Sequence, residues 1–237
     1  MNKFYESISK YYSRIFPSDN KKTDFLLDAC GDGMYVLDVA CGSGETAKAM
    51  MEAGKDVVGI DYEVSMVSEA RKNGIRAYSM DMRSIELDEK FDLIYCIGNS
   101  ISHLKSLDEV DEYLFQMPLL LNHGGCFVIQ IINYFGIWDD NAKDGAEIGQ
   151  LPTIEKDNLT FERKYFRDGD MIRFHTRLTT EDGVLINDQE LLPIQPDKLI
   201  DYIVAMGFDV ELYGSFDRES IFDLENSQNF IIEARRR

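Results

Sequence analysis

The stretch that decides the fold is Val36-Leu-Asp-Val-Ala-Cys-Gly-Ser-Gly-Glu-Thr-Ala47. It begins as an apolar run typical of a β-strand, and this run carries an acid at Asp38. Two glycines, Gly42 and Gly44, then end the run, and good helix formers follow. This order predicts a strand, a tight turn and a helix. The bare backbone of such a turn and the free N–H groups of the helix can hold a small ligand.

Residues 34–134 alternate short apolar runs with helical patterns. Expected strands cover 34–39, 56–61, 75–78, 91–97 and 126–132, and expected helices cover 44–53, 63–72 and a segment that begins at Ser106 and is kinked by Pro118. Such alternation predicts a parallel sheet, wound right-handedly, with helices on both faces. With two later strands at 208–213 and 229–234, the predicted fold class is α/β, a doubly wound, Rossmann-like, mostly parallel sheet of seven strands.

The pattern changes after residue 134. Residues 135–150 are rich in Gly and Asp, and strand-like runs from Leu159 to Leu192 are separated by two Asp-Gly turns. Asp-Gly between such runs is a strong hairpin signal, so we expect an inserted antiparallel β meander after the fifth strand. The expected organisation is one domain over residues 1–237, with an N-terminal helical cap (1–30), a ligand-binding core (31–134), the inserted sheet (135–193), and a closing helix and strands (194–237).

Charge and composition narrow the class of protein. Forty-three acidic and twenty-five basic side chains leave a formal net charge of −18, which repels phosphate backbones and anionic bilayers. The four cysteines lack metal-type spacing. The chain shows no signal-peptide core, and no apolar run reaches the ~20 residues that span a bilayer. We therefore expect a cytoplasmic protein, a monomer or homodimer, without a metal site and without a nucleic-acid or membrane partner.

Two kinds of ligand fit the glycine turn. Residues 42–47 match the dinucleotide pattern G-x-G-x-x-A, and Asp61 lies at the end of the next strand, which favours a nicotinamide-dependent oxidoreductase. However, Asp38 would oppose a pyrophosphate at this turn. S-adenosylmethionine has no phosphate and carries an ammonium and a sulfonium, so Asp38 favours it, and its ribose diol suits Asp61. A protein that binds this cofactor without catalysis is a third alternative.

On these residues the chain resembles the class I S-adenosylmethionine-dependent methyltransferases. The resemblance rests on residues 36–44, Gly59-Ile60-Asp61, Met80-Asp81-Met82-Arg83 and residues 91–96. Residues 96–104 and 131–134 resemble the small-molecule branch that includes glycine/sarcosine N-methyltransferases. The resemblance implies methyl transfer from S-adenosylmethionine to a small-molecule acceptor, at an amine nitrogen by in-line displacement, with S-adenosylhomocysteine as product.

The resemblance also implies a set of cofactor-binding residues. The methionine part lies on the glycine turn with Asp38 behind it, Asp61 binds the ribose, and Asp81 binds the adenine amine. Backbone groups after the fourth strand hold the ammonium, and an N-terminal tyrosine covers the cofactor. The expected residues are Tyr12, Asp38, Ala40, Cys41, Gly42, Gly44, Asp61, Tyr62, Met66, Asp81, Met82, Cys96, Ile97 and Gly98.

The acceptor site is expected beyond the strand ends. A sulfonium methyl is already activated, so a neutral amine needs alignment more than acid–base help. The candidates for catalysis are His103, Asn99 and Tyr134, and those for substrate binding are Asn133, Trp138, Arg173 and His175. Arg173 and His175 share one strand face with Arg177, which is either a site for an acceptor carboxylate or a solvated outer face with charges paired across strands. The residues leave N-, O- and C-methylation open.

Overall fold

A central sheet of seven strands organises the chain. The computed structural model describes residues 8, 11–17 and 19–236. The sheet consists of β1 (Tyr35–Val39), β2 (Asp56–Asp61), β3 (Arg76–Ser79), β4 (Phe91–Cys96), β5 (Leu121–Ile132), β10 (Phe208–Tyr213) and β11 (Asn229–Arg236). Their order is β10-β11-β5-β4-β1-β2-β3, and β11 runs antiparallel to both of its neighbours while the remaining pairs are parallel. The prediction of a doubly wound, mostly parallel sheet of seven strands is confirmed.

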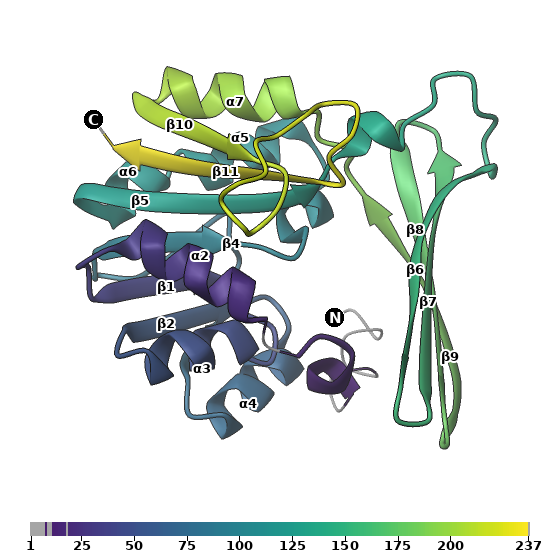
Figure 1. Ribbon diagram of the computed structural model, residues 1–237, viewed down its shortest axis with the longest axis horizontal. Helices are drawn as coiled ribbons and strands as arrows, with labels where there is room; N and C mark the ends of the chain where they lie inside the picture. Colours follow the sequence, from purple (N-terminus) through teal and green to yellow (C-terminus); the bar gives the residue numbers. More distant parts are fainter. Residues whose placement is uncertain (1–7, 9–10, 18, 237) are drawn as a thin grey trace.

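Helices cover both faces of this sheet (Figure 1). One face packs on α2 (Asn20–Cys30), α3 (Glu45–Glu52) and α4 (Val64–Lys72), and the other on α5 (Leu107–Leu114), α6 (Met117–Leu120) and α7 (Pro196–Ala205). Successive strand residues point to opposite faces, so Val36 joins the α2 side and Leu37 the α5 side. Both layers are therefore built from near-continuous apolar strands, as expected of a sheet buried on both faces.

Two local expectations need correction. Pro118 does not kink one long helix, because α5 ends at Leu114 and a separate α6 carries Pro118 in its first turn, where its missing N–H costs little. In addition, the meander begins earlier than the sequence indicated, because residues 147–156 form a strand despite Pro152. Its pairing register shifts between Leu151 and Ile154, and Pro is tolerated at such an irregular sheet edge.

The second sheet has four antiparallel strands in sequence order. These are β6 (Glu147–Lys156), β7 (Leu159–Asp168), β8 (Met171–Thr180) and β9 (Gly183–Leu191). Both expected Asp-Gly hairpins are confirmed, and Asp157 and Asn158 between β6 and β7 have φ values of 44° and 61°, which suits a tight hairpin turn. Figure 1 shows this sheet standing beside the carboxyl ends of the parallel strands.

Residues 11–17, near the N-terminus, lie between the two sheets (Figure 1). Residues 11–15 are helical, and Tyr11 and Ile15 pack with Met66 of α4 and with Phe161 and Leu178 of the second sheet. At the far end of the second sheet, Arg14 Nη2 donates to the carbonyl of Asp157 at 2.6 Å. The second sheet therefore reaches the central domain partly through a segment that precedes it by more than one hundred residues. No helix among the described residues is long and apolar enough to cross a membrane.

Candidate active site

Two adjoining cavities lie at the carboxyl ends of the parallel strands. The first, of about 490 Å³, is bordered by the ends of β2 and β3 and by the start of α5, and the second, of about 530 Å³, extends beneath the four-stranded sheet. They share four lining residues, Tyr12, Ala40, Gly98 and His103. Ligands of doubly wound sheets bind at this edge, and a ligand that occupied both cavities would pass this shared wall.

The glycine turn contributes Ala40 to the shared wall and Gly42 to the first cavity. Gly42 and Gly44 have φ values of +56° and +83°, a region that favours glycine. A Cβ atom on Gly44 would lie 2.8 Å from Ile75 Cγ1, so Gly44 permits the close packing of the turn against the segment before β3. A Cβ on Gly42 would lie 3.2 Å from Cε1 of Tyr12. The ring of Tyr12 therefore covers the turn.

Asp61 joins the end of β2 to the glycine turn. Its Oδ2 accepts a hydrogen bond from the Gly42 N–H at 2.9 Å, and its Oδ1 accepts one from the Glu63 N–H at 2.8 Å. Burial raises the pKa of this carboxyl group, and the two backbone donors act in the opposite direction. The carboxylate is thus held in one orientation at the wall of the first cavity before any ligand arrives.

Asp38, at the end of β1, is a buried acid that lines the second cavity. The hydroxyl of Tyr95 donates a hydrogen bond to its Oδ2 at 2.7 Å. Burial raises the pKa of Asp38 to about 8, while the Tyr95 hydrogen bond opposes this shift. Asp38 makes no ion pair with the described residues, so a cationic group in the cavity would stabilise its ionised form.

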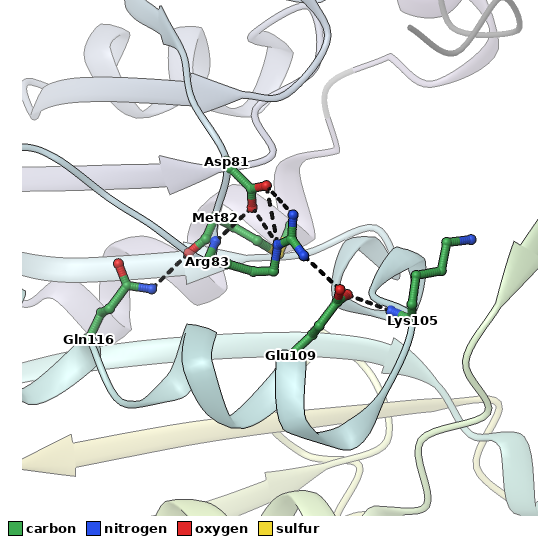
Figure 2. A network of polar contacts seen from close by, with 6 residues as sticks. All are labelled: Asp81, Met82, Arg83, Lys105, Glu109 and Gln116. Atoms are coloured by element: carbon green, nitrogen blue, oxygen red, sulfur yellow. Dashed lines mark hydrogen bonds and ion pairs between the residues drawn. The ribbon is translucent and has the colours of Figure 1, made fainter.

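An ion-pair network borders the first cavity on the side of β3 (Figure 2). Arg83 Nη2 donates to Asp81 Oδ2 at 2.6 Å and Arg83 Nη1 to Glu109 Oε1 at 2.6 Å. The hydrogen bonds from Arg83 lower the pKa of Asp81. Glu109 also accepts from the Lys105 N–H, and Gln116 Nε2 donates to the Met82 carbonyl at 2.9 Å. This network holds the loop after β3 against α5.

The loop after β4 is held by hydrogen bonds to the Gln130 side chain, the Ile132 backbone and the Tyr134 hydroxyl. The Gly98 N–H donates to Gln130 Oε1 at 2.7 Å, and Asn99, with φ of +68°, accepts from the Ile132 N–H at 2.9 Å. Asn99 Nδ2 also donates to the hydroxyl of Tyr134 at 2.7 Å. Asn99 lines the second cavity, but Tyr134 is fully buried behind it and lines neither cavity. Tyr134 is therefore placed to position Asn99.

His103 lies on the wall between the two cavities, in the short helix η1 (Ser100–His103). Burial lowers its pKa to about 4, and the charge of Lys105 acts in the same direction. The imidazole is therefore neutral at neutral pH, and it can orient a ligand by hydrogen bonding more readily than it can store a proton.

Several residues expected to bind substrate lie elsewhere. Trp138 is covered by the guanidinium of Arg167, 3.6 Å from its ring centroid. Asn133 caps the short helix η2 (Tyr134–Gly136) and donates to the carbonyl groups of Leu224 and Ser227. Arg173 and His175 both contact Asp188, at 3.0 Å and 2.9 Å, on the face of β8 opposite to Phe174, which lines the second cavity. None of these four residues lines either cavity.

The fourteen expected cofactor-binding residues differ in whether they line a cavity. Twelve of them line at least one of the two cavities, namely Tyr12, Asp38, Ala40, Cys41, Gly42, Asp61, Tyr62, Met66, Asp81, Met82, Ile97 and Gly98. Gly44 and Cys96 line neither, because Gly44 packs on Ile75 and Cys96 is fully buried in the core. Sequence reasoning missed Gln130 of β5 and the inner face of the second sheet, above all Arg163 and Tyr165. The one sequence signal for these residues was the alternation of side chains along the strands. Alternation predicts that a strand has two faces, but it does not indicate which face covers the site.

The strand order and a glycine turn flanked by two acids define a cofactor-binding domain, and comparison with known proteins identifies its kind. A family model described as a methyltransferase domain matches residues 36–125. A glycine/sarcosine N-methyltransferase of Aphanothece halophytica is 29% identical over 190 residues, covering 76% of this chain and 69% of that protein. Another, from Halorhodospira halochloris, is 30% identical over 149 residues, so the chain spans 56% of that protein's length.

Solved structures share the whole architecture. An S-adenosylmethionine-dependent methyltransferase from Clostridium acetobutylicum has a TM-score of 0.79 at 17% identity, with 99% of both chains covered. CalS10, an amino pentose methyltransferase from Micromonospora echinaspora, has a TM-score of 0.71 at 21% identity, with 99% of this chain and 97% of that one covered. At these identities the likeness shows the fold. The family model over residues 36–125 and the sequence relatives support a class I S-adenosylmethionine-dependent methyltransferase.

Proposed function

We propose that this methyltransferase transfers the methyl group of S-adenosylmethionine to the nitrogen of a small amine and releases S-adenosylhomocysteine. The observation that carries the proposal is the pair of adjoining cavities, one for each substrate, with a shared wall. The names of the relatives support an amine as acceptor. Two of them are glycine/sarcosine N-methyltransferases, and a structural neighbour is an amino pentose methyltransferase.

The residues on both sides of the shared wall fit this cofactor. Asp38 is a buried carboxyl group without an ion pair among the described residues, and a cationic ligand would offset the cost of its ionisation. Asp61 keeps unused lone pairs that can accept hydrogen bonds from a ribose diol. Met66 and Met82 supply apolar contacts in the first cavity, where Asp81 can accept from an adenine amine while it remains paired with Arg83.

Methyl transfer requires this chain mainly to align the acceptor nitrogen with the methyl group of the cofactor. When bound, S-adenosylmethionine supplies a methyl group that is already activated for displacement. The acceptor nitrogen forms its new bond to carbon as the sulfur–carbon bond breaks, and the proton that the nitrogen loses passes to water. Asn99 and His103 line the second cavity and are placed to orient the nitrogen, since a neutral imidazole offers one donor and one acceptor. Tyr134 acts through Asn99, because its hydroxyl accepts a hydrogen bond from the side-chain amide of Asn99.

Calorimetry and mass spectrometry test the proposal. We expect binding of S-adenosylmethionine and S-adenosylhomocysteine, no comparable binding of NAD(H), and conversion of at least one amine in a panel of small primary and secondary amines. Binding of NAD(H) without any response to S-adenosylmethionine would overturn it. Cofactor binding with no turnover across amine, hydroxyl and carbon acceptors would instead support the non-enzymatic alternative. Methylation confined to hydroxyl acceptors would refute only the choice of nitrogen.

We also propose the wider setting of the enzyme. The excess of acidic side chains supports a small-molecule acceptor over nucleic acid, because a net charge of −18 repels a phosphate backbone. We propose that residues 1–237 act as a single domain in the cytoplasm, as a monomer or a homodimer. Light scattering at several concentrations tests the oligomeric state.

A further inference from the structure

The inner face of the second sheet places two polar side chains in the second cavity. Arg163 and Tyr165 lie two residues apart on β7, so they point to the same face, and both line this cavity. Neither residue falls in a motif that the cofactor requires. The second sheet therefore contributes its own chemistry to the acceptor side of the site.

Arg163 is a half-buried cation whose donors are incompletely satisfied. Its Nη2 donates to the carbonyl of Pro152 at 2.7 Å, but its Nε is buried without a hydrogen-bond partner. Within the residues that the structure describes, Arg163 makes no ion pair. Burial lowers the pKa of its guanidinium. A buried, unpaired charge is costly unless a ligand supplies the missing partner.

The other arginines of the second sheet differ from Arg163 in their partners or in their position. On the opposite face, Arg173 pairs with Asp188 at 3.0 Å, and Arg177 lies 3.8 Å from Glu162. Arg167 stacks on the ring of Trp138 at 3.6 Å. Arg173 and Arg177 have acidic partners, whereas Arg163 and Arg167 have none among the described residues, and each of these two keeps one buried guanidinium nitrogen without a hydrogen-bond partner. Arg163, whose guanidinium carbon lies 5.6 Å from the ring centroid of Phe161, is the one of these four arginines that lines a cavity.

Tyr165 offers a second donor beside Arg163. Its side chain is 1% exposed and lines the cavity, and its hydroxyl makes no hydrogen bond with the described residues. A buried phenol normally finds a partner. A guanidinium and a phenol on the same strand face can both donate to one group of oxygen atoms, which is the arrangement that a carboxylate or phosphate requires.

The second cavity is lined by charges of both signs. Asp38 lies at the end of β1, and Asp19 and Glu45 line the same cavity. Lys21 and Lys22, at the start of α2, line the same cavity as Arg163. A ligand with an amine directed toward Asp38 and an anionic group directed toward Arg163 would match these charges.

We propose that Arg163 and Tyr165 form an anion-binding subsite, and that the methyl acceptor is an amine that carries a carboxylate or phosphate group. This inference rests on the proposed N-methyltransferase function. The subsite places the acceptor by its anionic end and leaves the nitrogen at the shared wall. Arg163 and Tyr165 are therefore substrate-binding residues that determine specificity, and they take no part in bond formation.

Steady-state kinetics on matched acceptors test the subsite. The panel contains carboxylate amines such as glycine, sarcosine and β-alanine, the phosphate amine phosphoethanolamine, and the neutral counterparts ethanolamine and glycinamide. We expect the anionic acceptors of one class to be preferred. Arg163→Gln should raise their KM by about 10- to 100-fold, because a charge-assisted hydrogen bond is lost, and should change kcat little. Arg163→Lys should restore part of the loss, and Tyr165→Phe should have a smaller effect in the same direction.

A matched control is Arg177→Gln, which removes an arginine from the outer face of the same sheet and should leave every KM unchanged. Equal turnover of charged and neutral amines, with Arg163→Gln affecting both alike or neither, would overturn the subsite while leaving the proposed function intact. A preference for carboxylate or for phosphate amines distinguishes the two sources of the anion. A variant is folded if its circular dichroism spectrum and its cofactor affinity match those of the wild-type enzyme, and both are measured for each variant.

If no amine is methylated, the proposed function fails, and direct binding still tests the subsite. Acetate and inorganic phosphate are then titrated into the enzyme saturated with S-adenosylhomocysteine. Binding of either anion to the wild-type enzyme that is at least tenfold weaker in Arg163→Gln and unchanged in Arg177→Gln would support an anion-binding subsite. Absence of binding, or binding that Arg163→Gln does not affect, would overturn it.

Discussion

The two cavities that meet at Tyr12 and His103 are built in different ways. The wall of the first is local, because Asp61 is fixed by the N–H groups of Gly42 and Glu63, and the Asp81–Arg83–Glu109 network holds the loop after β3 (Figure 2). The wall of the second is assembled from α2, β5, the segment after β10 and the second sheet. The first is set by backbone geometry at strand ends, and the second by how separate layers dock.

The difference teaches where each kind of specificity resides. A cofactor common to a whole family can be held by strand ends and turns that the fold itself places. An acceptor that differs between relatives needs residues that can change without disturbing the sheet, and the inserted strands provide them. Substitutions in the first wall should therefore affect folding and cofactor binding, whereas those in the second should affect the acceptor.

The largest expected effect is on the glycine turn. Gly44→Ala forces a left-handed residue, which costs about 1–2 kcal/mol. It also brings a Cβ to 2.8 Å from Ile75 Cγ1, and overpacking of this kind costs about 1–3 kcal/mol. Chemical denaturation should show the sum of both losses in the free energy of unfolding. Gly54→Ala is the control, because Gly54 has φ of +90° but no atom within 4 Å of its Cβ position. Equal losses in the two variants would contradict the packing argument.

Asp61→Ala should act mainly on the cofactor. Loss of charge-assisted hydrogen bonds to the ribose diol should weaken binding of S-adenosylhomocysteine by about 1.5–3 kcal/mol, as measured by calorimetry. Asp56→Ala, at the exposed start of the same strand, is the control and should leave the affinity unchanged. An unaltered affinity in Asp61→Ala would remove this residue from the site and weaken the distinction between the two walls.

Much of the first wall could be predicted from the sequence, and the second could not. Gly42 follows β1 and Asp61 ends β2, so the topology of a parallel sheet places both at one edge. Arg163 and Tyr165 carry no comparable signal. The strand β8 presents three basic residues on one face and Phe174 on the other, and the basic face resembles a binding surface more closely. Which face covers the site depends on contacts of Phe161 and Leu178 with the N-terminal segment, and these span most of the chain.

Asp38 should make stability depend on pH. Its folded-state pKa of about 8 lies above the unfolded value of about 3.9. The stabilisation from the protonated carboxyl group is therefore fully present below the unfolded pKa and is lost as the pH rises through the folded pKa. Between pH 5 and pH 9 the wild-type free energy of unfolding should fall relative to that of Asp38→Asn, by on the order of 1 kcal/mol or more.

Denaturation of the cofactor-free enzyme at several pH values checks this dependence. Tyr95→Phe removes the hydrogen bond that favours ionised Asp38, so it should shift the loss of stability to higher pH. A difference between the wild type and Asp38→Asn that does not vary with pH would show that the carboxyl group titrates normally. Asp38 would then lack the environment that favours a cationic ligand.

The smallest expected effect is on the outer face of the second sheet. Arg173→Gln removes an exposed ion pair with Asp188, and such pairs contribute about 0–1 kcal/mol to stability. Because Arg173 points away from the cavity that Phe174 lines, its loss should leave the KM for every acceptor unchanged, as should His175→Gln. A selective rise in the acceptor KM for either variant would mean that the outer face binds substrate. The contrast between the two faces of the sheet, and with it the assignment of Arg163, would then have to be reversed.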